Sequence, residues 1–332
     1  MANEQGNSQS ATRARPKFTR PLRSIALFGG TNEISQSAAR FIRERNKGVG
    51  LRLLVRKPEA RAELNKLFPD AEIMVADYFD RASLAEGLRG IDAVFVVTPD
   101  FFDETTAMTN FVEAARAADI QHIVRMTGDP PGMTMARVPD FIKRGGNVPS
   151  IQHLYARAVL EASGLPVTFL NSAAYYMQTL LMPIFADSVR NDNVVLVSCD
   201  KLTAFIDKAD IGACVGALLL SDDYRHIGAS YHVNNGHDLM RFDKLAELFG
   251  DVLGRKIGYE ESEQRFLERY DKPLQEMLKI PEAGKLVAEM FKFEWVHEHA
   301  WRRSDMVQHL LGRPAKTLRV WLEENRQKFE PA

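Results

Sequence analysis

Residues 24–35 read Ser-Ile-Ala-Leu-Phe-Gly-Gly-Thr-Asn-Glu-Ile-Ser, and this stretch decides the fold. A short apolar run enters a glycine turn, and the pattern that follows is helical. This sequence of strand, turn and helix seats the pyrophosphate of a dinucleotide on a helix N-terminus. A G-x-x-G-x-x-G spacing would require glycine at 29, 32 and 35, whereas the chain has Gly29, Asn32 and Ser35.

The two departures from glycine bear on whether the turn binds a phosphate. Asn32 tolerates a left-handed backbone, so we expect the turn to survive with Asn32 at positive φ. Its side chain occupies space that pyrophosphate needs, and Ser35 adds bulk where the helix packs on the strand. Glu33 places a carboxylate at the helix N-terminus, where it repels phosphate. The turn therefore favours dinucleotide binding. The alternative is a vestigial fold that binds another ligand or none.

The first half of the chain alternates apolar runs with amphipathic patterns. We expect strands at 25–28, 51–55, 73–75, 93–97, 122–126 and 167–170, with helices between them. This predicts an α/β fold, a Rossmann-type doubly wound parallel sheet with a small, mostly helical C-terminal lobe. Residues 1–23 are expected to form a disordered tail and 24–170 the Rossmann dinucleotide-binding core. Residues 171–332 are expected to form a substrate lobe interleaved with the last sheet strands.

Composition narrows the class of partner. A net charge of −1 over 332 residues gives no footprint for direct nucleic-acid or anionic-membrane binding. No stretch approaches the roughly 20 apolar residues of a membrane span. Two cysteines without a C-x-x-C pair favour a reducing, cytoplasmic location. His297-Glu298-His299 lacks a third well-placed ligand, so we expect no metal. The sequence leaves open whether the chain forms a homodimer.

Polar residues follow three of the expected strands. Arg56 and Lys57 come after the second strand, where an NAD-selective site usually carries an acid. Two cations there suit a 2′-phosphate and favour NADPH over NADH; a solvated loop pair is the alternative. Asp77 ends the third strand; it is expected either to bond near the adenine or to cap the next helix. Thr98-Pro99 closes the fourth strand.

A general acid is less easily assigned. No tyrosine has a lysine four residues on, so the Tyr-x-x-x-Lys pair of short-chain dehydrogenases is absent. Thr127, after the fifth strand, is expected to bond a substrate. His153 opens the helix expected at 153–162, where an imidazole would relay a proton or simply cap the helix. Tyr175, Tyr176 and Met177 follow the sixth strand and form either a pocket for a flat substrate or lobe core.

Several stretches together resemble the NmrA-like branch of atypical short-chain dehydrogenases. They include Leu-Phe-Gly-Gly-Thr (27–31), Leu-Leu-Val-Arg-Lys-Pro (53–58), Ala-Asp-Tyr-Phe-Asp (76–80), Ala-Val-Phe-Val-Val-Thr-Pro (93–99), His-Ile-Val-Arg-Met-Thr (122–127) and Phe-Ile-Asp-Lys-Ala-Asp-Ile-Gly (205–212). The resemblance spans about residues 24–328 and implies a Rossmann domain with an NAD(P)-binding edge. Some members resemble isoflavone or triphenylmethane reductases, and others are redox-sensing regulators without turnover. In the isoflavone-reductase type a catalytic lysine stands where His153 stands here.

We therefore expect an enzyme of secondary metabolism, an NADPH-dependent reductase of a flat aromatic or polycyclic metabolite. A non-catalytic NADP(H) sensor, and a non-redox enzyme that has lost its cofactor, are the alternatives. The expected cofactor-binding residues are Gly29, Gly30, Thr31, Asn32, Glu33, Ile34, Arg56, Lys57, Asp77, Tyr78, Thr98 and Pro99. His153 and Thr127 are the expected catalytic residues, and Met133, Tyr175, Tyr176 and Met177 the expected substrate contacts.

Overall fold

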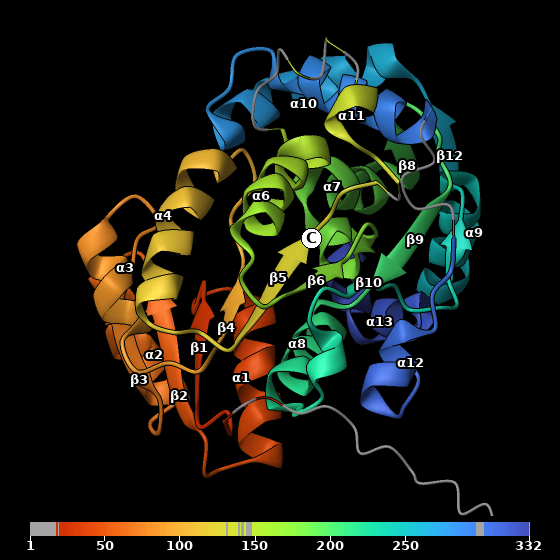
Figure 1. Cartoon of the computed structure of the whole chain (residues 1–332). Helices are drawn as coiled ribbons and strands as arrows, with labels where there is room; N and C mark the ends of the chain where they lie inside the picture. Colours follow the sequence, from red (N-terminus) through yellow and green to blue (C-terminus); the bar gives the residue numbers. More distant parts are fainter. Residues whose placement is uncertain are drawn as a thin grey trace, which may run out of the picture.

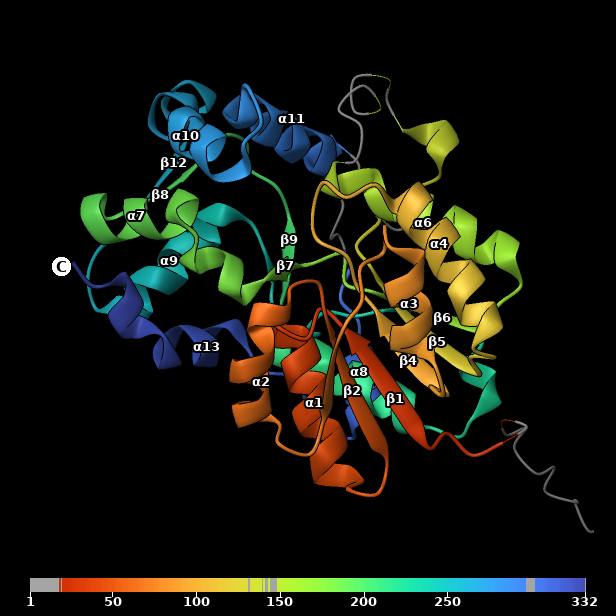
Figure 2. The same cartoon turned by 90° about the vertical axis from the view of Figure 1, so that its left-hand side faces the viewer.

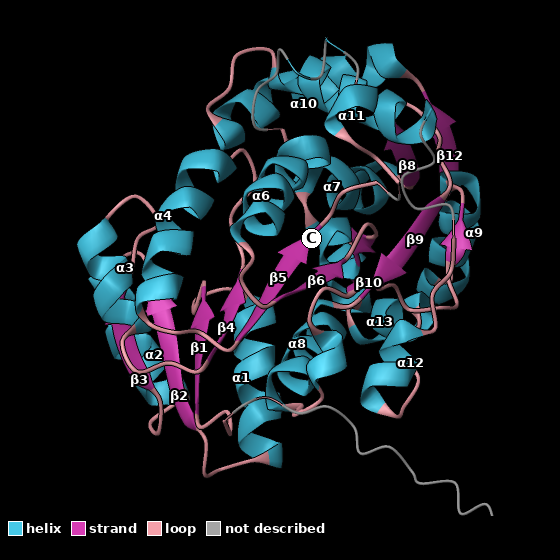
Figure 3. Ribbon diagram, in the orientation of Figure 1, coloured by secondary structure: helices cyan, strands magenta, loops and turns pink. Residues whose placement is uncertain are grey.

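The computed structural model of the chain describes residues 18, 20–130, 132–138, 140, 143, 148–296 and 302–331. Seven strands form one parallel sheet in the order β10-β6-β5-β4-β1-β2-β3 (Figures 1 and 3). This confirms the expected α/β fold. The strands are β1 (Ser24–Phe28), β2 (Gly50–Val55), β3 (Glu72–Val75), β4 (Ala93–Val96), β5 (His122–Thr127), β6 (Val167–Asn171) and β10 (Ser230–His232).

Helices cover both faces of this sheet because successive strand side chains point to opposite sides. Figure 2 shows helices on either side of the sheet. In β1, Ile25 and Leu27 join the core under one set of helices, and Ala26 and Phe28 join the core under the other. The first set is α1 (Glu33–Arg45), α2 (Arg61–Leu67), α8 (Lys208–Leu220) and α12 (Met306–Leu311). The second set is α3 (Arg81–Leu88), α4 (Glu104–Ala117) and α6 (Pro149–Ser163).

The remaining elements form a lobe along the top and right-hand side of Figure 1. Aromatic side chains such as Phe185, Phe242 and Phe291 fill its core. Two small sheets, β11-β9-β7 and β12-β8, run through it. Its elements are β7 (Tyr175–Tyr176), α7 (Pro183–Asp192), β8 (Val194–Val197), β9 (Thr203–Ile206), β11 (Leu239–Met240), α9 (Phe242–Leu253), β12 (Gly258–Glu261), α10 (Glu263–Leu278), α11 (Ala283–Val296) and α13 (Leu318–Glu324).

Three elements that follow residue 171 return to the sheet: β10 lies at its edge, and α8 and α12 lie on one face. The described residues also form short 3₁₀ helices: η1 (Pro58–Ala60), η2 (Met135–Arg137), η3 (Met177–Leu181), η4 (Tyr224–His226) and η5 (Arg326–Phe329). Residues 1–17, which hold most of the expected tail, lie outside the described part, and so does His297-Glu298-His299. No helix among the described residues is long and apolar enough to cross a membrane.

The contact between α1 and α8 is close enough to require glycine at position 212. A Cβ added there would lie 2.5 Å from the carbonyl oxygen of Ile34 and 2.8 Å from the backbone nitrogen of Ala38. Neither atom moves without moving α1, so Gly212→Ala should lower the free energy of unfolding by about 2 kcal/mol, as overpacking does. Urea unfolding measures the change. Gly48→Ala is the control, because the nearest atom to its added Cβ is 3.4 Å away; equal stability of both variants would contradict the prediction.

Candidate functional site

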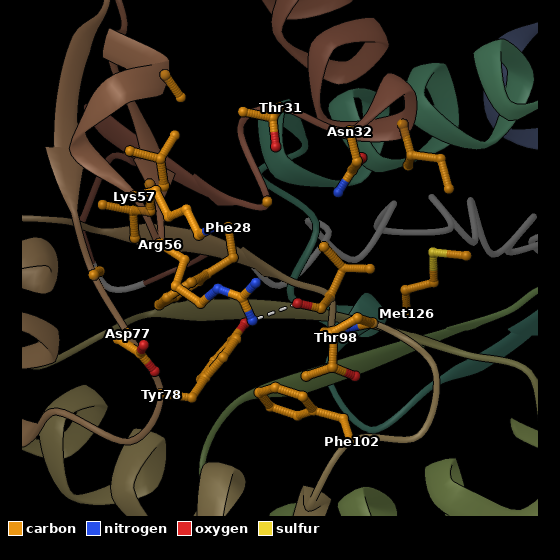
Figure 4. A pocket seen from close by; sticks show the side chains of 18 of the residues that line it. Phe28, Thr31, Asn32, Arg56, Lys57, Asp77, Tyr78, Thr98, Phe102 and Met126 are labelled. Atoms are coloured by element: carbon orange, nitrogen blue, oxygen red, sulfur yellow. Dashed lines mark hydrogen bonds between the residues drawn. The ribbon is translucent and has the colours of Figure 1, made fainter. Parts of the chain in front are cut away.

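One pocket of about 1000 Å³ lies at the carboxyl ends of β1 to β4 (Figure 4). Parallel strands end at the same edge of a sheet, so the residues that follow them meet there. The expected site residues that line the pocket are Gly29, Thr31, Asn32, Glu33, Ile34, Arg56, Lys57, Asp77, Tyr78, Thr98, Pro99, His153 and Tyr176. The sequence therefore anticipated most of the pocket wall, though not what each residue does there.

The turn after β1 is built differently from the expected one. Gly29 takes the left-handed conformation, with φ +65°, and Gly30 donates its N–H to the carbonyl of Leu54 at 3.0 Å. Asn32 has φ −84°, so the expectation of a positive φ there is wrong. It is the N-cap of α1 instead: its Oδ1 accepts a hydrogen bond from the N–H of Ser35 at 2.8 Å. Asparagine suits both roles, and the cap satisfies an amide that the helix leaves unpaired.

The side chain of Ser35 also has a defined role. It is completely buried, and its Oγ donates a hydrogen bond of 2.7 Å to the carbonyl of Phe28. The hydroxyl therefore ties the first turn of α1 to the last residue of β1. The bulk that Ser35 adds where the helix packs on the strand is accommodated by this hydrogen bond.

The first turn of α1 keeps donors for an anion. Among the described residues, the amide N–H groups of Glu33 and Ile34 find no acceptor, and both residues line the pocket. Such N–H groups, together with the helix dipole, bind phosphates. The carboxylate of Glu33, expected to repel a phosphate, accepts a hydrogen bond from Gln178 Nε2 at 3.0 Å. This contact holds one of its oxygens on the lobe side of the turn.

Charged side chains occupy the end of the pocket near β2 and β3. Arg56 and Lys57 are exposed and form no ion pair with any described residue, so both are available to a ligand (Figure 4). Asp77 does not cap a helix; Asp80 caps α3, and Asp77 Oδ1 accepts the N–H of Phe79 at 2.9 Å. Tyr78 donates to the carbonyl of Val97 at 3.1 Å, and burial raises the pKa of its phenol.

The opposite end of the pocket carries His153, Tyr176 and Lys208. The expectation that His153 opens its helix is wrong, because α6 begins one turn earlier, at Pro149. Burial raises the pKa of Tyr176 to about 12, and its hydroxyl lies 3.2 Å from Ser172 Oγ. The ammonium of Lys208 lies 5.6 Å from the centre of the Tyr176 ring. This end therefore combines an imidazole, a neutral phenol and a cation.

Some expected site residues lie away from this pocket. Tyr175 faces the lobe core, because neighbouring strand residues point to opposite sides; its hydroxyl accepts a hydrogen bond of 2.7 Å from Lys201. Met177 is fully buried in the same core. Met133 packs with apolar residues of α6 and α11. Thr127 is buried, and its hydroxyl finds no partner among the described residues.

A buried ionic cluster behind the pocket escaped the sequence reasoning. Arg125 in β5 and Glu104 at the start of α4 are both fully buried and form an ion pair of 2.7 Å. Thr98 and His153 contact the same Arg125 Nη2, at 3.0 and 3.4 Å. An arginine in the middle of a buried strand was the available signal, because a buried charge requires a partner.

Metal binding has no support in the part of the chain described here. No group of three or more His, Cys, Asp or Glu side chains is placed to hold an ion among those residues. Both cysteines, Cys199 and Cys214, are free and buried.

Comparison with known proteins places these features in a family. The model of the NmrA-like family matches residues 22–306. A (4-alkanoyl-5-oxo-2,5-dihydrofuran-3-yl)methyl phosphate reductase of Streptomyces griseus is 29% identical over 324 residues, covering 92% of this chain and 99% of that protein. An NAD(P)H azoreductase of Xenophilus azovorans is 27% identical over 241 residues, 71% of this chain and 76% of that protein.

A solved structure shows the same fold. The triphenylmethane reductase of Citrobacter sp., determined in complex with NADP(H), superimposes with a TM-score of 0.72 at 18% identity. The match covers 90% of this chain and 99% of the reductase. The expected likeness to triphenylmethane reductases is confirmed.

The hydrogen bond of Ser35 gives a direct test of how the turn is built. Ser35→Gly should lower the free energy of unfolding by about 2–3 kcal/mol, since it combines a lost buried hydrogen bond with glycine's helix penalty. Ser37→Gly in the same helix is the matched control, because it carries the helix penalty without a comparable hydrogen bond to β1. Equal losses in urea unfolding would mean that the Ser35 contact contributes nothing.

Proposed function

Because the chain belongs to the NmrA-like family, we propose that it is an NADPH-dependent reductase of a small, flat acceptor. One observation carries this proposal. A single pocket runs from the first turn of α1, where the amides of Glu33 and Ile34 face the pocket, to His153 and Tyr176. A dinucleotide along the strand ends and an acceptor at the far end would fill the two parts of this pocket.

The residues present fit the cofactor. A Cβ at position 29 would lie 2.3 Å from Asn32 Nδ2 and 3.1 Å from Val97 Cγ1, so only glycine fits at this point of the turn. The N–H groups of Glu33 and Ile34 would donate to the pyrophosphate, whose charge suits the helix N-terminus. When bound, a reduced nicotinamide supplies a hydride, which no side chain can supply.

The preference for NADPH rests on the charged end of the pocket. Arg56 and Lys57, which form no ion pair with a described residue, would bind the 2′-phosphate, which NADH lacks. Asp77 and Tyr78 would lie beside the adenine, and Thr98 and Pro99 beside the nicotinamide.

The acceptor is proposed from the chemistry of the other end. Tyr176 offers an aromatic face that suits a flat molecule, and its phenol stays neutral at physiological pH. His153 would bond the acceptor. The relatives' names describe reduction of a dihydrofuranone phosphate and of azo groups, both unsaturated. We propose that the acceptor of this chain likewise carries an unsaturated, electron-poor group that accepts a hydride.

A fluorescence titration tests the proposal. Purified protein is titrated with NADPH, and nicotinamide fluorescence is followed before and after adding 1,4-naphthoquinone or an azo dye. Saturable binding followed by acceptor-dependent oxidation supports the reductase. Binding without oxidation of either acceptor supports an NADP(H)-sensing regulator instead. Absence of binding contradicts both and leaves a non-redox function.

The cation pair provides a test of cofactor preference. Arg56→Ala combined with Lys57→Ala should weaken NADPH binding about 10- to 100-fold, as expected when charge-assisted hydrogen bonds are lost. The ratio of NADPH to NADH affinity should fall by the same factor. The control is Arg61→Ala with Lys66→Ala, which removes the same charge from exposed positions of α2. An unchanged ratio would show that Arg56 and Lys57 do not bind the 2′-phosphate.

A further inference from the structure

The acid in the first turn of α1 competes with any anion that binds there. Glu33 directly follows the N-cap Asn32, and its N–H and that of Ile34 find no acceptor among the described residues. A carboxylate near a helix N-terminus is attracted by the same dipole and amides that attract a phosphate. Glu33 is exposed and lines the pocket, so its side chain lies beside this space. Unless a contact holds it elsewhere, this carboxylate opposes the binding of a diphosphate.

One side chain of the lobe holds the Glu33 carboxylate. Gln178 Nε2, in η3, donates a hydrogen bond of 3.0 Å to Glu33 Oε1. Within the part of the chain that the structure describes, this carboxylate has no ion pair and no second hydrogen bond. The bond joins positions that lie 145 residues apart in the chain. It therefore depends on how the lobe meets the sheet and not on the local sequence of α1.

The amide group of Gln178 is fixed by two further contacts. Its Nε2 also donates to Asp207 Oδ1 at 2.8 Å, and its Oε1 accepts the N–H of Lys208 at 3.3 Å. Both amide hydrogens and the amide oxygen are thus used. The reversed orientation would place Oε1, which only accepts hydrogen bonds, against two carboxylates. Gln178 therefore presents one N–H to Glu33 in a single orientation.

Asp207 is a well-held anchor for that amide. It is buried, and it caps α8 through its own Oδ1. Lys316 Nζ lies 3.2 Å from its Oδ2, which offsets the charge. On the other side, the backbone of Gln178 is held by Met177 and Leu180 of the same segment, both fully buried in the lobe core. The side chain and the backbone of Gln178 are therefore both held by structure outside α1.

We propose that Gln178 is a positioning residue that holds the Glu33 carboxylate away from the first turn of α1, so that this turn binds the diphosphate of the cofactor. The inference rests on the dinucleotide site of the proposed function and adds a residue of the lobe to it. Gln178 contacts Glu33 and not the cofactor, so it acts by removing a competing charge. In this way a turn with an acid as its first helical residue still accepts an anion.

A purely structural tie between α1 and the lobe is the alternative explanation of this hydrogen bond. The two explanations differ in what the removal of Glu33 does. If Gln178 only stiffens the fold, its loss costs the same cofactor affinity with or without the Glu33 carboxylate. If Gln178 removes a competing charge, its loss costs affinity only while that carboxylate is present.

A double-mutant cycle measured by isothermal titration calorimetry separates these cases. Wild type, Gln178→Ala, Glu33→Ala and the double variant are titrated with NADP+, after urea unfolding has shown that each is folded. Gln178→Ala should weaken binding about 5- to 10-fold, as expected when an acid is released near a helix N-terminus that binds an anion. The double variant should bind within about 2-fold of Glu33→Ala, because the competing charge is then gone.

Glu59 provides the matched control, because it is an exposed acid that lines the same pocket without a hydrogen bond to Gln178. Gln178→Ala should weaken binding by the same factor in the wild type and in Glu59→Ala. An equal loss with and without Glu33, or no loss at all, overturns the inference and leaves the reductase proposal intact. If Gln178→Ala does not fold, Gln178→Met, which keeps the length of the side chain without a donor, takes its place in the cycle.

Inorganic pyrophosphate, titrated into the same variants, separates the role of Gln178 from the proposed function. If the wild type binds pyrophosphate but not NADP+, the reductase proposal fails, and the cycle measured with pyrophosphate decides the role of Gln178. If the wild type binds neither, both proposals fail, because the turn then has no anion site from which a charge must be removed. Binding of NADP+ that Gln178→Ala weakens and Glu33→Ala restores supports the site and the role of Gln178 together.

Discussion

The site depends on how closely the start of α1 is held to the end of β1. Gly29 reverses the chain in a left-handed conformation, Asn32 caps the helix, and Ser35 donates to the carbonyl of Phe28. Together these contacts aim the N–H groups of the first helical turn at the strand edge, where the pocket lies. The close packing of α8 at Gly212 then fixes α1 from its other side. Asn32 and Ser35, which stand where a G-x-x-G-x-x-G turn has glycine, thus hold this turn by hydrogen bonds.

The sequence predicted the features that depend on local periodicity and strand ends. The parallel sheet followed from apolar runs between amphipathic patterns, and the positions of Arg56, Lys57 and Asp77 followed from where those runs stop. The role of Asn32 could not be predicted, because asparagine suits both an N-cap and a left-handed turn. For Tyr175 and Tyr176 the order along the chain does not say which one faces the lobe core, since alternation alone fits either choice.

The buried cluster shows a different limit. Glu104 and Arg125 lie 21 residues apart in the chain and belong to a helix and a strand. Their meeting depends on how α4 lies over β5, and a single sequence carries no direct measure of that packing. What the sequence does contain is the anomaly itself, a charge inside an apolar strand. Such a residue predicts a buried partner of opposite charge without identifying it.

The two ends of the pocket differ in the physical basis of their recognition. At the Arg56 end, exposed cations and backbone amides meet solvent, so their attraction is long-ranged, adaptable and weakened by salt. At the His153 end, the supporting charges are buried and shared among fixed partners, so the local dielectric is low and each hydrogen bond is strong. A large, flexible, multiply charged ligand needs the first kind of contact. The second kind of contact holds its side chains in one orientation, because the buried charges of Arg125 and Glu104 are paired with each other.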